Sequence, residues 1–174
     1  MPDKTPIEIG IKIPNDPDEI QEYALKVINA ISRHVFLTAK LQRKIKLILI
    51  ELVTNSIKHS EDPDALIRLT INHPRLIIEK VDVGLQIKFQ GAEQIPFQEV
   101  NKNINVSFSE NNSYHIKIID QYHFKFIDSF KENMNIERMP EHFGLYIIIM
   151  ASDGFEYQHN PKSNENTFIV NVNL

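Results

Sequence analysis

The sequence of 174 residues contains no cysteine, only five glycines and no long apolar run. Without cysteine the chain can form neither disulfides nor thiolate zinc sites, and this composition fits a reducing compartment. No segment reaches the ~20 apolar residues that a membrane helix requires, and no apolar run follows a basic start as in a secretory signal. We therefore expect a cytoplasmic protein that does not enter a membrane.

The charge balance and the motif content argue against further classes of function. The formal net charge is -4, so no basic surface indicates a nucleic-acid partner. The seven histidines show no H-x-x-x-H spacing, and neither G-x-S-x-G nor a P-loop is present. We expect no zinc site, no serine-hydrolase site and no P-loop nucleotide site.

The hydrophobic periodicity predicts one α+β domain over residues 1–174. Helical spacing is found at about 17–33, 38–59 and 144–152, and strand patterns at 7–13, 66–71, 76–81, 155–158 and 167–174. Shorter strand patterns lie within a long lid or insertion at about 90–141. This order predicts a two-layer α/β sandwich with a mixed, mostly antiparallel sheet covered by helices on one face.

The stretch ELVTNSIKHS (residues 51–60), at the end of the second predicted helix, carries a line of polar side chains. Glu51 and Asn55 are four residues apart, and Lys58 or His59 follows after three or four more, so they share one helical face. The carboxylate can accept a proton from an attacking hydroxyl, and the amide oxygen can bind a hard Mg²⁺ ion. The spacing therefore indicates a base and a metal ligand one helical turn apart.

Together with three later segments, this stretch resembles the signatures of the Bergerat-fold (GHKL) ATPases. Glu51, Asn55, Lys58 and His59 match the N-box of that superfamily, which includes DNA gyrase, heat-shock chaperones, mismatch-repair ATPases and sensor histidine kinases. The later matches are Asp82-x-Gly84 after a strand, Gly144 at the start of the third helix, and Thr167 on the last strand. The resemblance covers nearly the whole chain and is greatest to the small anti-sigma-factor serine/threonine kinases.

The resemblance implies the histidine kinase-like ATPase fold, with ATP and Mg²⁺ as cofactors. Glu51 would be the general base and Asn55 the Mg²⁺ ligand, with Lys58 and His59 at the polar mouth of the site. The other implied roles are adenine contacts for Asp82, Gly84 and Thr167 and phosphate binding for Gly144. The implied function is signal transduction, in which a regulatory protein such as a sigma factor or an anti-anti-sigma protein is phosphorylated or sequestered. A homodimer is left open.

The sequence leaves several alternatives open. Gln86 stands where the second glycine of Asp-x-Gly-x-Gly is expected, and only Gly144 remains of the Gly-x-Gly pair. A degenerate, nucleotide-free interaction module that keeps the fold is therefore the alternative function. Asp120 is an alternative to Asp82 as the adenine contact. The basic residues Lys40, Arg43, Lys44 and Lys46 indicate either a solvated helix face or a docking site for an acidic partner.

Overall fold

The computed structural model describes residues 5–59, 62–91, 93–109, 112–127 and 143–174. The helices are α1 (Ile20–Ser32), which follows the short 3-10 helix η1 (Pro17–Glu19), α2 (Ala39–His59) and α3 (Phe143–Ala151). The strands are β1 (Ile7–Lys12), β2 (Leu66–Asn72), β3 (Arg75–Val83), β4 (Asn103–Ser109), β5 (Asn112–Asp120), β6 (His123–Phe126), β7 (Gly154–Asn160) and β8 (Glu165–Asn173). Each predicted helix and strand is present, and the bounds differ by only a few residues.

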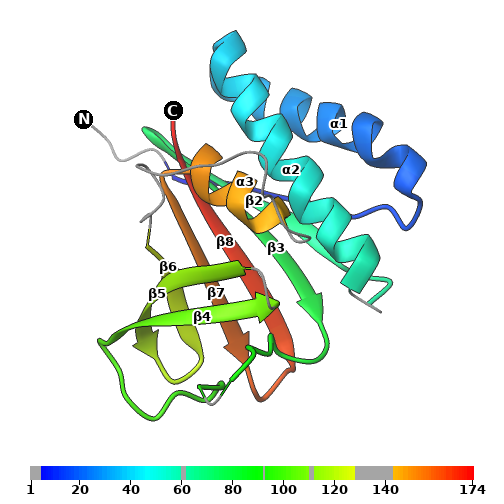
Figure 1. Ribbon diagram of the computed structural model, residues 1–174. Helices are drawn as coiled ribbons and strands as arrows, with labels where there is room; N and C mark the ends of the chain where they lie inside the picture. The colour runs from blue at the N-terminus through cyan, green and yellow to red at the C-terminus, as the bar shows by residue number, and fades with distance from the viewer. Residues whose placement is uncertain (1–4, 60–61, 92, 110–111, 128–142) are drawn as a thin grey trace.

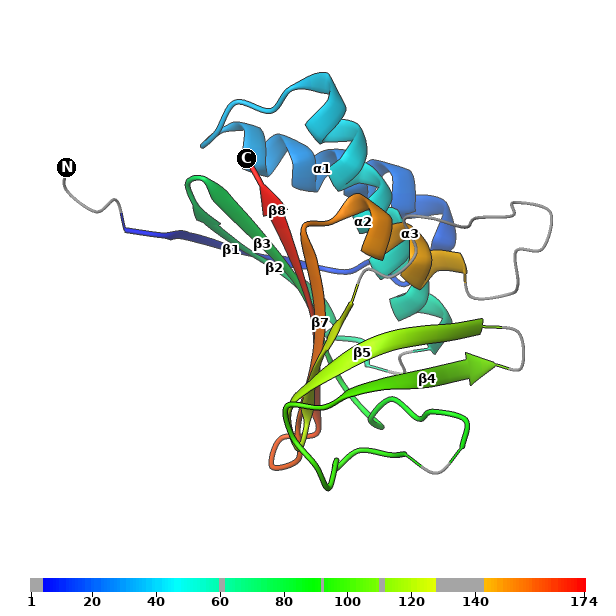
Figure 2. The same ribbon diagram turned by 60° about the vertical axis from the view of Figure 1, so that its left-hand side comes forward.

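The described strands form one eight-stranded sheet in the order β1-β2-β3-β8-β7-β6-β5-β4. Figures 1 and 2 show all three α-helices on one face of this sheet, which confirms the predicted α+β sandwich. The prediction of a mixed sheet is wrong, because every neighbouring pair of described strands is antiparallel. Short hairpins join most neighbours, and such connections can only produce antiparallel pairs.

The helices α1 and α2 cover the sheet because each has one apolar face, whereas α3 is apolar along its whole length. In α1 the buried residues recur at helical spacing, and in α2 an apolar face runs through the middle of the helix. The buried residues of these two faces are Tyr23, Ala24, Val27, Ile28, Ile31, Ile45, Ile48, Leu49, Leu52 and Val53. Among the described residues, no helix combines the length and the apolar character needed to cross a membrane.

Strand alternation decides which residues of β3 reach the helix-covered face. Successive side chains of a strand point to opposite faces of the sheet. Leu76 and Ile78 are fully buried beneath the helices, so the next two members of the same row, Lys80 and Asp82, point to that face as well. The strand therefore carries two charged side chains into the interior at its C-terminal end.

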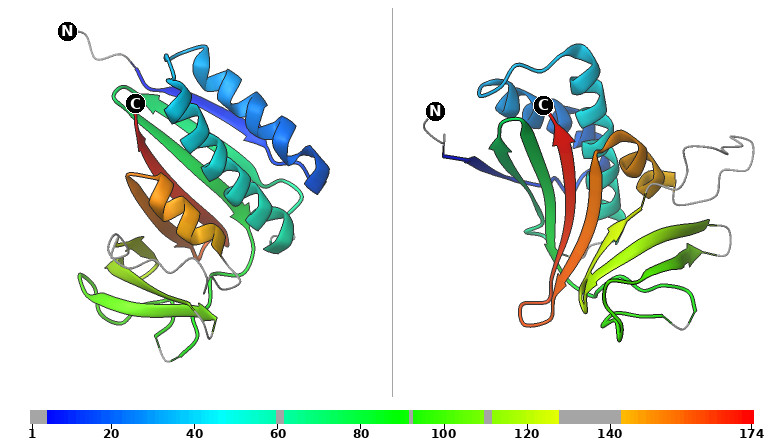
Figure 3. Two further views of the ribbon diagram at one scale, coloured as in Figure 1. Left: turned by 45° about the horizontal axis from the view of Figure 1, so that its top comes forward. Right: turned by 90° about the vertical axis from the view of Figure 1, so that its left-hand side faces the viewer.

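The predicted insertion at about 90–141 continues the sheet. Its strands β4, β5 and β6 add to the edge of β7, and a stack of buried aromatic rings that includes Phe89, Phe97 and Phe124 fills their inner side. In Figure 3 (right) β4 and β5 turn toward the same side of the sheet as the helices. Residues 92, 110–111 and 128–141 of the predicted insertion lie outside the described residues.

Candidate functional site

The C-terminal half of α2 carries the polar line that the sequence predicts. At its N-terminal end α2 is capped by Thr38, whose Oγ1 accepts a hydrogen bond from the backbone N–H of Leu41 at 3.2 Å. Glu51 and Asn55 are half-buried, and His59 is exposed at the end of the helix. The apolar face of α2 packs on the sheet, so the adjoining polar line lies at the border between the helical layer and the sheet.

Gly144 brings the first turn of α3 against this polar line. A Cβ atom added at Gly144 would lie 2.5 Å from Oε2 of Glu51 and 3.6 Å from Nδ2 of Asn55. The first of these distances is too short for real atoms, so any side chain at position 144 would displace the Glu51 carboxylate. The absence of a side chain at Gly144 therefore allows α3 to start directly beside Glu51 and Asn55.

The environment of Glu51 makes its carboxylate more basic. Burial raises the pKa of the Glu51 carboxyl, and the positive charge of Lys58 partly offsets this effect. Lys58 itself is exposed to solvent. A carboxylate with a raised pKa holds a proton more strongly, which is the property that a general base requires.

Lys80 and Asp82 form a buried ion pair on the helix-covered face of β3. Lys80 is 4% exposed and Asp82 is 6% exposed, and Nζ of Lys80 contacts Oδ2 of Asp82. The ammonium group also lies 4.6 Å from the centroid of the Phe168 ring on β8, at a cation–π distance. Each charge depends on the other for its burial, because an unpaired ion in this place would be strongly destabilising.

Asn166 on β8 connects Asp82 to the neighbouring strands. Its Nδ2 donates to Oδ1 of Asp82 at 3.1 Å and to the carbonyl oxygen of Leu85 at 3.3 Å. Its Oδ1 lies 2.6 Å from the hydroxyl of Tyr157, which donates to it, and 2.9 Å from Nδ1 of His159. Because an amide oxygen only accepts, Nδ1 of His159 carries a hydrogen in this arrangement. The network fixes the orientation of the Asp82 carboxylate.

Tyr157 holds the segment that follows Asp82. Its hydroxyl oxygen accepts a hydrogen bond from the backbone N–H of Ile87 at 3.1 Å. Burial raises the pKa of the Tyr157 hydroxyl, the Ile87 hydrogen bond lowers it, and the charge of Asp82 raises it. The net effect is a rise, so the hydroxyl stays protonated and remains a donor to Asn166.

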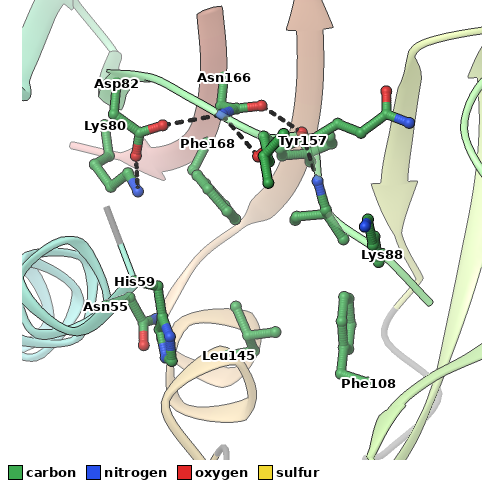
Figure 4. Close-up of a pocket in the computed structure, with 13 residues that line it drawn as sticks. Asn55, His59, Lys80, Asp82, Lys88, Phe108, Leu145, Tyr157, Asn166 and Phe168 are labelled. Atoms are coloured by element: carbon green, nitrogen blue, oxygen red, sulfur yellow. Dashed lines mark hydrogen bonds and ion pairs between the residues drawn. The ribbon is translucent and has the colours of Figure 1, made fainter. Parts of the chain in front are cut away.

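These groups surround a cavity of about 350 Å³, which we call the polar cavity (Figure 4). Its volume lies within the range of small-ligand sites. The helices contribute Asn55, His59 and Leu145, and β4 contributes Phe108. The remaining lining residues belong to the sheet and to the segment after β3: Lys80, Asp82, Leu85, Gln86, Ile87, Lys88, Tyr157, Asn166 and Phe168. Lys80 and Lys88 outnumber the single lining carboxylate, Asp82, so the cavity favours an anionic ligand.

Most of the predicted site residues meet at or beside the polar cavity. Asn55, His59 and Asp82 line it, and Glu51 and Gly144 lie next to Asn55. Lys58 and Gly84 are not among its lining residues. The backbone N–H of Gly84 donates to the carbonyl oxygen of Asn164 at 2.9 Å, which ties the start of the Leu85–Lys88 segment to the β7–β8 turn.

The predicted adenine contact Thr167 and the alternative contact Asp120 both lie away from the polar cavity. Thr167 lies between Asn166 and Phe168 on β8, and because those two side chains line the cavity, Thr167 points to the opposite face of the sheet. Asp120, at the end of β5, is exposed, and its Oδ1 accepts from the backbone N–H of Tyr122 at 2.8 Å. Of the two candidate aspartates, only Asp82 lines the cavity.

The residues of the polar cavity that the sequence interpretation missed include Lys80, Asn166 and Phe168. A signal for Lys80 exists in the sequence, since it stands two residues before Asp82 on the same predicted strand and must share its face. The same alternation distinguishes Asn166 and Phe168 from Thr167, but only once the face of β8 that meets the helices is known.

The four residues of the predicted basic cluster do not all line the same surface. Lys40, Arg43 and Lys44 line a second, mostly apolar groove between α2 and α3, whereas Lys46 does not. Lys44 also forms an ion pair with Asp153 at 3.4 Å. This groove is separate from the polar cavity, and no residue lines both.

Comparison of the sequence with protein-family models and with curated proteins finds no match to either.

Proposed function

We propose that the polar cavity binds ATP with Mg²⁺, and that the protein is a Bergerat-fold signalling domain that phosphorylates a serine or threonine of a regulatory protein partner. The observation that supports this proposal is the convergence of signatures that are distant in the sequence. Asn55 and Asp82 line one cavity, and Gly144 lies against both Glu51 and Asn55. An ATP-dependent reaction of this kind fits a cytoplasmic location and a chain without cysteine.

The residues beside the cavity have the chemistry that this ligand requires. When bound, ATP supplies the phosphoryl group, and Mg²⁺ offsets the charge of its phosphates. Asn55 offers an amide oxygen to Mg²⁺, which takes few protein ligands and prefers oxygen. The first N–H groups of a helix have no partner within the helix, so those at the start of α3 would donate to phosphate oxygens, and Gly144 has no side chain to block their approach.

Two carboxylates would then have different tasks. Glu51, with its raised pKa, would accept the proton of the attacking hydroxyl group. Asp82 would accept a hydrogen bond from the amino group of adenine. Although both of its oxygens already have a partner, a carboxylate has about four accepting positions, so two remain.

Isothermal titration calorimetry tests the first step of this proposal. We expect saturable binding of ATP to the protein at sub-millimolar concentration in the presence of Mg²⁺, and weaker binding when Mg²⁺ is replaced by a chelator. Asn55→Asp keeps an oxygen ligand, whereas Asn55→Leu removes it, so only the second variant should lose the dependence on Mg²⁺. If the wild-type protein takes up no ATP at millimolar concentration, the proposed function is wrong.

One observation favours the alternative function, a nucleotide-free interaction module that keeps the fold. The Lys80–Asp82 ion pair and the Asn166 hydrogen bond together engage both oxygens of the carboxylate that would contact adenine. The calorimetric experiment separates the two functions, because the module would bind no nucleotide.

The substitution Gly144→Ala tests the contact between α3 and the polar line of α2. The new methyl group would push the Glu51 carboxylate away from its position. We expect phosphoryl transfer to fall by at least about tenfold, since a small displacement of a catalytic group can reduce rates a hundredfold. Phosphorylation of the partner protein measures this effect, and circular dichroism checks that the fold is retained.

Gly10→Ala is the matched control for this substitution. Gly10 lies on β1, and a Cβ atom there would meet nothing within 4 Å. We expect no change in transfer for this variant. Equal rates for Gly144→Ala and Gly10→Ala would contradict the role of the close contact at Gly144.

A further inference from the structure

We propose that Lys80 selects the base of the bound nucleotide. Its ammonium group would donate a hydrogen bond to a ring nitrogen of adenine, next to the amino group that donates to Asp82. This inference rests on the proposed function. It starts from an unusual feature of the polar cavity, which is a lysine that is 4% exposed and still lines the cavity. Figure 4 shows its ammonium group pointing from Asp82 toward the side where His59 and Asn55 lie.

The ammonium group of Lys80 has N–H donors that its contact with Asp82 does not use. Among the described residues, Asp82 is its only hydrogen-bonding partner, and the Phe168 ring is its other neighbour. An ammonium group carries more N–H donors than one carboxylate oxygen uses. A ligand in the cavity that brings an acceptor close to Asp82 would therefore meet a fixed, charged donor.

The pair of Lys80 and Asp82 presents a donor and an acceptor side by side. The matching edge of a ligand must carry an acceptor next to a donor. In adenine the amino group is flanked by N1 on one side and by N7 on the other, and both ring nitrogens are acceptors. Whichever side turns toward α2, an acceptor therefore meets Lys80 while the amino group meets Asp82.

Guanine does not fit the same position. It carries the acceptor O6 where adenine has the amino group, so in the position assigned to adenine O6 would face the Asp82 carboxylate, and neither group can donate to the other. Guanine can pair its O6 with Lys80 and its N1–H with Asp82 only if the base shifts within the cavity, which displaces the attached phosphates relative to Asn55. A site with buried polar groups rejects a ligand that leaves them unpaired. The hydrogen bonds of Asn166 to Asp82 and to Leu85 keep the carboxylate from turning away. We therefore expect ATP to bind more tightly than GTP, with Lys80 as the residue that adds the second contact.

Adenine analogues test this inference without any change to the protein. The wild-type protein is titrated with ATP, 1-deaza-ATP and 7-deaza-ATP, each with Mg²⁺. The first analogue lacks the acceptor N1 and the second lacks the acceptor N7. We expect one analogue to bind at least about tenfold more weakly than ATP, because a hydrogen bond to a charged group is lost, and the other to bind like ATP. Equal binding of all three, or tighter binding of GTP than of ATP, would overturn the role of Lys80. If ATP itself does not bind, the proposed function fails instead.

Variants then assign the effect to Lys80. In Lys80→Met the weaker analogue should bind as tightly as ATP, whereas in Lys88→Met the difference between the two ligands should persist. Lys88 lines the same cavity but is exposed, so its variant controls for the loss of positive charge. Where Lys80→Met does not fold, Lys80→Arg keeps the charge but moves the donors, and the difference should shrink. An undiminished difference in a folded Lys80 variant would contradict the inference.

Discussion

Replacing Glu51 with glutamine is expected to abolish phosphoryl transfer while ATP still binds. Glutamine keeps the shape of the side chain beside Gly144 but cannot accept a proton from the attacking hydroxyl. The loss of a general base typically lowers the rate by about 10²–10⁴-fold. Single-turnover transfer of the γ-phosphoryl group from labelled ATP to the partner protein measures the rate, and calorimetry measures binding. Transfer at the wild-type rate would remove Glu51 from the role of the base.

The stability of the same variant separates catalysis from structure. The pKa of Glu51 is raised in the folded state, so its carboxyl favours folding below the unfolded pKa, and this contribution is lost as the pH rises through the folded pKa. Above the folded pKa the ionised side chain therefore disfavours folding, and there Glu51→Gln should unfold at the same or a slightly higher temperature. Glu22→Gln, at an exposed position on α1, is the control and should change neither transfer nor unfolding.

The sequence was sufficient to predict the elements of the fold and much of the candidate site. The strict alternation of Ile7, Ile9 and Ile11 identifies a strand, and the four-residue spacing of Glu51 and Asn55 defines one helical face. Both are local properties, because they depend on the geometry of a single element. In the structure the same local rules hold, since Asn55 lines the polar cavity and Glu51 lies beside it.

The remainder could not be predicted because it depends on how elements pair. The strands β4, β5 and β6 add to the edge of β7. The sequence of one segment does not determine to which edge of a sheet it adds. The face of β8 is likewise set by its register with β3, where Thr167 is opposite Val81 and Phe168 is opposite Lys80. That register brings Asn166 and Phe168 to the cavity and excludes Thr167, although a threonine is the more familiar polar residue on a strand.

Removing one partner of the Lys80–Asp82 pair should cause the largest loss of stability of any substitution considered above. Asp82→Asn leaves the ammonium group of Lys80 buried without an opposite charge, and breaking a buried ion pair in this way typically costs about 3–5 kcal/mol. The free energy of unfolding, measured by urea denaturation without nucleotide, should fall by that amount. The result does not depend on whether the protein binds ATP.

The surface ion pair of Arg68 and Glu79 supplies the matched control, because it joins β2 to β3 across the open face of the same sheet. Its nitrogen and oxygen atoms are 3.7 Å apart, and the Arg68 side chain is 43% exposed. Glu79→Gln should therefore change the free energy of unfolding by less than about 1 kcal/mol. The double variant Lys80→Met with Asp82→Asn should recover most of the loss, because methionine removes the buried charge and still packs on the Phe168 ring. An equal loss in Asp82→Asn and Glu79→Gln would show that the charge of Lys80 is not confined in the interior, and would also weaken its assignment as the residue that selects the base.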